Sequence, residues 1–220
     1  MDAFRQSLEI PAGSVVLDAD IVIPKGPQGV VLFVHGSGSS RHSPRNRYVA
    51  GELQTIGLAT VLADLLNAEE ERLDARTAKL RFDIGLLAAR VIALTDWLAE
   101  DEHTAGLSVG YFGASTGAAA ALIGGAARPG QVKAIVSRGG RPDLAGEDLH
   151  LVRQPTLLIA GGSDEVVIDL NRRALQQLTG EARLEIIPGA GHLFEEPGAL
   201  EQVAGLARDW FGSHLKGDLS

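Results

Sequence analysis

The sequence predicts an α/β domain with a mainly parallel central sheet, helices on both faces and an antiparallel strand pair near the N-terminus. Short apolar runs alternate with helix-like stretches from Gly29 onward, which is typical of strands buried on both faces of a parallel sheet. The 220 residues are 45% hydrophobic, so we expect a single domain with a sizeable core over residues 1–220. The 27 glycines indicate tight turns and close backbone approaches.

After the first two strands, the elements follow a strand–helix order. Phe4–Ile10 and Ser14–Ile23 alternate like strands and are joined by Pro-Ala-Gly, which predicts an antiparallel pair. Short apolar runs predict the buried strands, and apolar residues recurring three or four apart predict the helices. The expected strands lie within 29–38, 58–66, 107–113, 132–140, 155–164 and 182–192, and the expected helices within 48–56, 75–99, 116–127, 166–178 and 197–215.

Charge and cysteine content exclude several kinds of protein and site. The formal net charge of −8 argues against a nucleic-acid partner. The absence of cysteine excludes disulfides, thiolate metal sites and a cysteine nucleophile. Charges run through the first 20 residues and interrupt the later apolar stretches, so we expect no secretory signal, no membrane partner and a cytoplasmic location. Without a metal-ligand or phosphate-loop motif, we expect no metal and no cofactor.

A serine between two glycines lies where a strand pattern gives way to a helix pattern. In the segment GASTG, Ser115 follows the strand, and Gly113 and Gly117 flank it at two positions' distance. A strained elbow of this kind presents a nucleophilic hydroxyl, and the small residues relieve crowding between strand and helix. The helix N-terminus also directs N–H groups at a nearby oxyanion. An ordinary turn fits the same five residues, so the choice depends on the rest of the chain.

An acid and a histidine follow later predicted strands. Asp164 ends the run TLLIAGGSD, where it either orients a histidine or caps the next helix, and Ser163 could supply that cap instead. His192 lies in the glycine-containing turn PGAGH, where a lone histidine is more often a surface residue. The order serine, acid, histidine, each after a separate strand, predicts a catalytic triad of Ser115, Asp164 and His192.

A triad also needs hydrogen-bond donors for the oxyanion. The backbone N–H of Thr116, directly after the nucleophile, is the first expected donor, and the loop after VVLFVHG supplies the second. Within HGSGSS, Ser37 is the first choice for this second donor and Gly38 the alternative. We expect His35 to hold the loop in place rather than to act as a second base.

Four segments carry a family resemblance: VLFVHGSGSSRHSPRNRYVA, VGYFGASTG, LLIAGGSDEVV and GAGHLFEEPGAL. On these segments, residues 29–215 resemble the α/β-hydrolase superfamily, within its dienelactone-hydrolase-like branch. The resemblance implies an α/β-hydrolase fold with hydrolysis at the triad. Dienelactone hydrolases carry a cysteine nucleophile where this chain has Ser115, so we expect chemistry closer to that of an ordinary esterase. Some members of the branch resemble arylesterases and phosphotriesterases.

Loop length and arginine positions bear on the substrate. Only the fourteen residues RPDLAGEDLHLVRQ separate two predicted strands, so we expect no large lid and an open cleft suited to small, soluble esters. Arg41, Arg138 and Arg141 follow predicted strands and are candidates for binding a substrate carboxylate, with Arg138 the first choice. The alternative is structural, with arginines paired to the acidic residues Asp143, Glu147 or Glu195.

Together these observations predict a serine hydrolase that cleaves small carboxylic esters through an acyl-enzyme intermediate, with a small-molecule ester as its partner. Two alternatives stay open. A lactonase, dienelactone hydrolase or phosphotriesterase could use the same triad, and a non-catalytic binding protein could keep the triad residues as relics. The pattern carries no signal for an oligomeric state.

Overall fold

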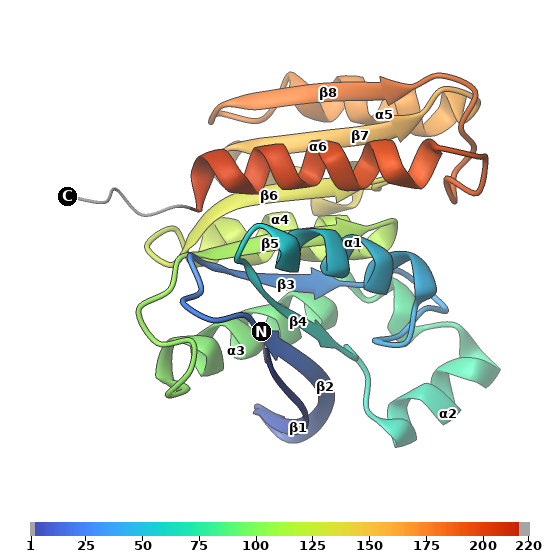
Figure 1. The fold of residues 1–220 in the computed structure, drawn as a ribbon. Coiled ribbons are helices and arrows are strands. Elements are labelled where there is room, and N and C mark those ends of the chain that lie inside the picture. The colour runs from blue at the N-terminus through green and yellow to red at the C-terminus, as the bar shows by residue number, and fades with distance from the viewer. Residues whose placement is uncertain (1–2, 216–220) are drawn as a thin grey trace.

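Eight strands form one sheet in the computed structural model, which describes residues 3–215. The strands are β1 (Phe4–Ala12), β2 (Val15–Ile23), β3 (Val30–Val34), β4 (Ala59–Ala63), β5 (Val109–Ala114), β6 (Val132–Arg138), β7 (Thr156–Gly161) and β8 (Ala182–Ile187). Their order across the sheet is β1-β2-β4-β3-β5-β6-β7-β8 (Figure 1). β2 pairs antiparallel with β1 and β4, and the remaining neighbours are parallel. The predicted sheet and its N-terminal pair are confirmed.

Helices cover both faces of this sheet, as predicted (Figure 1). Side chains alternate along each strand, so Val31 and Phe33 of β3 enter one core cluster while Leu32 and Val34 enter the other. The first face is covered by α1 (Pro44–Thr55) and α6 (Ala199–His214), and the second by α3 (Ile84–Glu100), α4 (Thr116–Ala127) and α5 (Glu165–Leu175).

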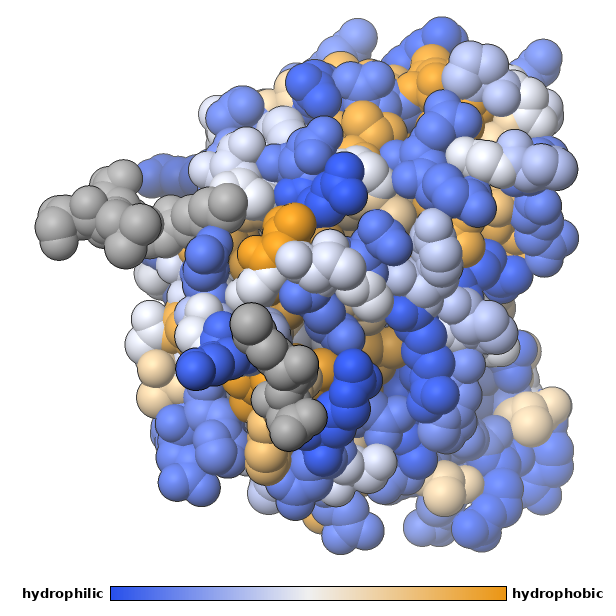
Figure 2. Space-filling model, viewed as in Figure 1, coloured by the Kyte–Doolittle hydropathy of each residue, from blue (hydrophilic) through white to orange (hydrophobic). Residues whose placement is uncertain are grey.

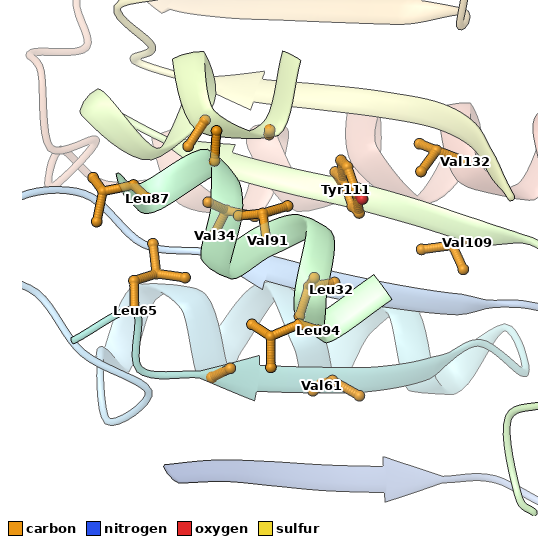
Figure 3. Close-up of a cluster of buried hydrophobic side chains, with 14 of the residues drawn as sticks. Leu32, Val34, Val61, Leu65, Leu87, Val91, Leu94, Val109, Tyr111 and Val132 are labelled. Carbon is orange, nitrogen blue, oxygen red and sulfur yellow. The ribbon is translucent and has the colours of Figure 1, made fainter. Parts of the chain in front are cut away.

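The larger core cluster lies between the sheet and the helices α3 and α4. Figure 3 shows Leu87, Val91 and Leu94 of α3 beside the strands that they cover. Tyr111 of β5 is fully buried among them, and its hydroxyl is hydrogen bonded to Thr95. Burial raises the pKa of Tyr111, which keeps its hydroxyl neutral in this apolar surrounding. This packing fixes the position of β5, and Ser115 directly follows the last residue of that strand.

The predicted helix over residues 75–99 is wrong in extent, because the chain breaks there. It forms α2 (Ala68–Thr77), the short 3-10 turn η1 (Leu80–Phe82) and then α3. Asn67 and Glu70 form a capping box that starts α2 earlier than predicted. Asp83 caps α3 by accepting the backbone N–H of Leu86 at 3.0 Å. Apolar spacing alone does not reveal these caps, although Asn-x-x-Glu is a sequence signature of a helix start.

Replacing Asp83 with alanine is expected to lower the free energy of unfolding by about 1 kcal/mol, because the N–H of Leu86 loses its acceptor. Urea denaturation monitored by circular dichroism measures the change in midpoint. Asp83→Asn is the matched control, because asparagine also caps helices well. An alanine variant as stable as the asparagine variant would contradict the capping role.

The connection between β6 and β7 forms no large lid. It consists mainly of η2 (Pro142–Leu151), two short turns separated by a kink at Gly146, and it packs against α4 and α5. The connection is as short as predicted, and the carboxyl ends of the parallel strands lie together at one edge of the sheet.

The molecular surface on the α1 and α6 side is mostly hydrophilic, with hydrophobic residues in small groups (Figure 2). Within residues 3–215, no helix combines the length and the apolar character needed to cross a membrane.

Candidate active site

Ser115 lies on a strained turn between β5 and α4. Its backbone has φ 51° and ψ −123°, a conformation that is costly for a residue with a Cβ. Ser115 is the N-cap of α4, yet its side chain makes no capping hydrogen bond. A Cβ at Gly113 would lie 2.6 Å from the Cα of Ala118, and one at Gly117 would lie 2.3 Å from the carbonyl oxygen of Val34. The segment GASTG is therefore a strained elbow rather than an ordinary turn.

Replacing Gly117 with alanine is expected to lower the melting temperature, because the added methyl group would meet backbone atoms that cannot rotate away. Overpacking of this kind costs about 1–3 kcal/mol. Gly205→Ala is the matched control: it lies within α6 with open space around it, and alanine there should stabilise by about 0.5–1 kcal/mol. Differential scanning calorimetry of both variants measures the two opposite shifts; a Gly117 variant as stable as the natural chain would contradict the steric reason.

Asp164 combines the two roles between which the sequence left a choice. Its Oδ1 accepts the backbone N–H of Val167 at 3.4 Å as the N-cap of α5, so Ser163 is not the cap. Its Oδ2 is 2.8 Å from Nδ1 of His192. Because a carboxylate only accepts hydrogen bonds, Nδ1 carries the proton and Nε2 of the neutral ring stays an acceptor.

Backbone hydrogen bonds hold the loops of Asp164 and His192 together. Ser163 N–H donates to the carbonyl of Ala190 at 2.9 Å, directly beside these residues. Phe194 anchors the far side of the His192 loop, because its side chain is fully buried in the core beneath α6. The loop after β7 and the loop after β8 are thus held against each other.

The three predicted triad residues line one open cleft of about 860 Å³, together with Ser37 and Thr116. Within residues 3–215, no hydrogen bond joins the Ser115 hydroxyl to His192. Catalytic hydrogen bonds are often long before substrate binds and shorten in the complex. The cleft therefore brings the three predicted triad residues together, without a hydrogen bond between Ser115 and His192.

The oxyanion candidates follow β3 and β5, which end side by side because Val34 pairs with Gly113. Thr116 is the first residue of α4, so the helix cannot use its backbone N–H. Ser37 lines the same cleft, and its N–H donates to the Thr116 hydroxyl at 3.0 Å. Gly38 instead lines a neighbouring hollow, so the geometry favours Ser37.

His35 is a structural ring, as expected. Leu65 N–H donates to its Nε2 at 3.1 Å, so Nδ1 carries the proton and donates to the carbonyl of Gly36 at 3.0 Å. Burial lowers the pKa of His35, against the opposing effects of the Gly36 carbonyl and the Asp64 carboxylate. A buried neutral ring with both nitrogens bonded has no capacity left for proton transfer.

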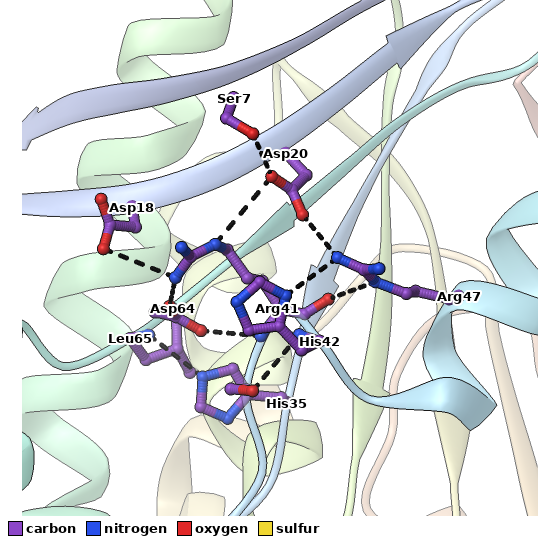
Figure 4. Close-up of polar contacts among 10 residues, drawn as sticks. Ser7, Asp18, Asp20, His35, Arg41, His42, Arg47, Asp64 and Leu65 are labelled. Carbon is purple, nitrogen blue, oxygen red and sulfur yellow. Dashed lines mark hydrogen bonds and ion pairs between the residues drawn. The ribbon is translucent and has the colours of Figure 1, made fainter.

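Arg41 belongs to a network of carboxylates rather than to the cleft (Figure 4). Its backbone N–H donates to Asp64 at 2.7 Å, and its guanidinium pairs with Asp64, Asp18 and Asp20. Arg47 joins Asp20 at 2.9 Å in the same network. The charge of Arg41 is thus used to connect the loop after β3 to β2 and β4.

The other two candidate substrate-binding arginines differ in position. Arg138, at the end of β6, is only 8% exposed as a residue and is absent from the lining of the triad cleft. Burial, together with the nearby charge of Arg45, lowers the pKa of Arg138 to about 10. Arg141 does line the cleft, but two hydrogen bonds of 2.8 Å join its guanidinium to Asp143. A substrate carboxylate would compete with Asp143 for Arg141.

Sequence reasoning missed the apolar rim of the cleft. Phe82 of η1 and Val166 of α5 are 58% and 72% exposed, and they line the cleft with Val167 and Leu170. Apolar spacing gave no signal for Phe82, because that spacing predicted one helix through the short turn η1 in which Phe82 lies. The rim suits an apolar part of a small molecule.

Among residues 3–215, no group of three or more histidine, aspartate or glutamate side chains is arranged to hold a metal ion.

Comparison with known proteins identifies the family. The family model described as the dienelactone hydrolase family matches residues 17–211. A crystal structure of a dienelactone hydrolase from Anabaena variabilis is 58% identical with a TM-score of 0.96, covering 98% of this chain and 100% of that chain. A dienelactone hydrolase-like promiscuous phosphotriesterase from metagenomic libraries is 17% identical with a TM-score of 0.79, covering 99% and 100% of the two chains, which shows the fold alone.

A Mycobacterium tuberculosis protein named for phosphoribosyl transfer is 56% identical over 212 residues, which cover 96% of this chain and 47% of that protein. This chain thus spans about half the length of the curated relatives that it matches. Because the family model covers most of the chain and a solved member matches it almost from end to end, the chain belongs to the dienelactone hydrolase family and has the α/β-hydrolase fold.

Proposed function

We propose that the protein is a serine hydrolase that cleaves small carboxylic esters through an acyl-enzyme intermediate. The observation that carries the proposal is the 2.8 Å contact between His192 and Asp164 in the cleft that also contains the strained Ser115. An acid, a histidine of defined tautomer and a serine on an elbow are the parts of a nucleophilic triad.

In this proposal, substrate binding brings Ser115 Oγ within hydrogen-bond reach of His192 Nε2. The histidine removes the serine proton as Oγ attacks the ester carbonyl, and the imidazolium formed is stabilised by Asp164. The N–H groups of Thr116 and Ser37 hold the oxyanion. His192 then protonates the leaving alcohol and activates the water that releases the acid.

The cleft supports small esters with an apolar part. It is open and bordered by Phe82 and Val166, whereas no large lid covers it within residues 3–215. Arg141 is the one predicted substrate-binding arginine at this cleft, and contact with a substrate carboxylate stays a prediction for it. Phosphoribosyl transfer forms no part of the proposal, because that name belongs to relatives about twice as long.

A panel of aryl acetates, lactones and aryl phosphotriesters, assayed beside fluorophosphonate labelling, tests the proposal. Hydrolysis of the acetates above the other classes, with one label on Ser115, is the expected result. Faster turnover of lactones or phosphotriesters would instead favour the alternative enzymes. No turnover of any of these substrates, together with no label on Ser115, would favour the non-catalytic binding protein. The expected cytoplasmic location also stays a prediction, which cell fractionation can test.

A further inference from the structure

The Thr116 side chain lies next to both backbone donors proposed for the oxyanion. Ser37 N–H donates to Thr116 Oγ1 at 3.0 Å, and the hydroxyl oxygens of these two residues are also 3.0 Å apart. Ser37 Oγ in turn donates to the carbonyl of Arg81 at 3.1 Å. Each hydroxyl has one proton. Since that of Ser37 is directed at Arg81, the proton between the two hydroxyls belongs to Thr116.

This arrangement restricts where an oxyanion can bind. A backbone N–H cannot turn, and that of Ser37 points at Thr116 Oγ1. An oxyanion served by the same N–H must therefore lie close to that oxygen and share the donor with it. Two oxygens at such a distance repel each other unless a proton lies between them. The Thr116 hydroxyl can supply this proton by turning about its Cβ–Oγ bond.

We propose that the Thr116 hydroxyl is a third hydrogen-bond donor to the oxyanion, which makes Thr116 a catalytic residue through its side chain as well as its backbone. The inference rests on the proposed serine-hydrolase function. In the free protein the hydroxyl donates to Ser37 Oγ. When negative charge develops on the substrate oxygen, the hydroxyl turns to that oxygen, because hydrogen bonds to ionised acceptors are stronger than neutral ones. The proton stays on Thr116 throughout.

The surroundings of Thr116 favour such a role. Its residue surface is only 4% exposed, and hydrogen bonds are stronger where water is excluded. Ser37 is held by the carbonyl of Arg81, and Arg81 is held by Asp74, which contacts the Arg81 Nε at 2.5 Å. Asp74 also accepts the backbone N–H groups of Leu80 and Arg81 at 2.8 and 3.1 Å. The Ser37 N–H and the Thr116 oxygen are thus fixed before substrate arrives, and only the Thr116 hydroxyl proton has to turn.

Thr116→Val and Thr116→Ser test the proposal on an aryl acetate. Valine keeps the shape of threonine and removes the hydroxyl, whereas serine keeps the hydroxyl. We expect Thr116→Val to lower kcat by about 100- to 1000-fold, the range for loss of one oxyanion donor. KM should change by less than about threefold, because the hydrogen bond forms only as charge develops. Thr116→Ser should keep most of the natural kcat.

Three results would overturn the role of the hydroxyl: an unchanged kcat in Thr116→Val, a raised kcat in that variant, or a serine variant as slow as the valine variant. A raised kcat would make the hydroxyl a competitor of the substrate for Ser37 N–H. If urea denaturation shows that the valine variant is unfolded, Thr116→Ala takes its place with the same expected loss. If the natural chain shows neither ester hydrolysis nor fluorophosphonate labelling, the proposed function and the role of Thr116 are both overturned. If the natural chain is active, the variants test the role of Thr116 separately from the proposed function.

Discussion

Replacing Ser115 with alanine is expected to lower kcat for aryl acetates by about four orders of magnitude or more, because no other group in the triad can form the acyl-enzyme. The fold should be unaffected, since the Ser115 side chain makes no capping hydrogen bond. Alanine still has a Cβ, so the strained φ of 51° is neither relieved nor worsened. Initial rates and intact-mass detection of fluorophosphonate labelling measure the loss.

Ser163→Ala is the matched control for this experiment. Ser163 lines the same cleft and the substitution removes the same hydroxyl group. We expect its kcat to stay within about threefold of the natural chain, because its hydroxyl has no step in the proposed mechanism. If Ser115→Ala kept turnover close to that of Ser163→Ala, Ser115 would not be the nucleophile.

Replacing Asp164 with asparagine is expected to lower kcat by about 10⁴-fold while leaving stability almost unchanged. The amide would donate to His192 Nδ1, so the ring would carry its proton on Nε2 and could not accept that of Ser115. Asparagine is as good an N-cap as aspartate, so the contact with Val167 N–H survives. Stopped assays at high enzyme concentration measure the loss of kcat. Urea denaturation measures the stability separately.

Two further variants separate capping from catalysis at Asp164. Asp164→Ala should lose both activity and about 1 kcal/mol of stability, because the cap is also removed. Asp169→Asn removes one negative charge on the exposed side of α5, where Asp169 pairs with Arg172, and should change neither property measurably. An Asp164→Asn variant with more than one tenth of the natural kcat would show that His192 is oriented by something else.

Much of the fold could be predicted because it depends on local pattern. The predicted strands agree with the observed ones to within a few residues. A strand that is buried on both faces appears in the sequence as a continuous apolar run, wherever it lies in the sheet. The error at residues 75–99 arose where capping decided the outcome: Asn67 and Asp83 each satisfy N–H groups that helix periodicity does not register. Polar residues at helix starts therefore determine where these helices begin as much as apolar spacing does.

The sequence by itself determined the order in which the site residues follow the strands: Ser115 comes after β5, Asp164 after β7 and His192 after β8. Strand ends in a parallel sheet meet at one edge, so chain order alone predicts that the three residues approach each other. Whether they act as a triad stays a prediction that the Ser115 and Asp164 variants test.

Only the tertiary structure decided which polar side chains face the cleft and which face other protein groups. Arg41, Arg138 and Arg141 looked alike in sequence, yet Asp18 and Asp64 surround the first, the second is buried, and only the third reaches the cleft. The hydrogen bond from Ser37 to the Thr116 hydroxyl joins residues 79 positions apart. Periodicity records whether a side chain is buried, but the partner of a charge or a hydroxyl depends on which distant segments the fold brings within about 3 Å.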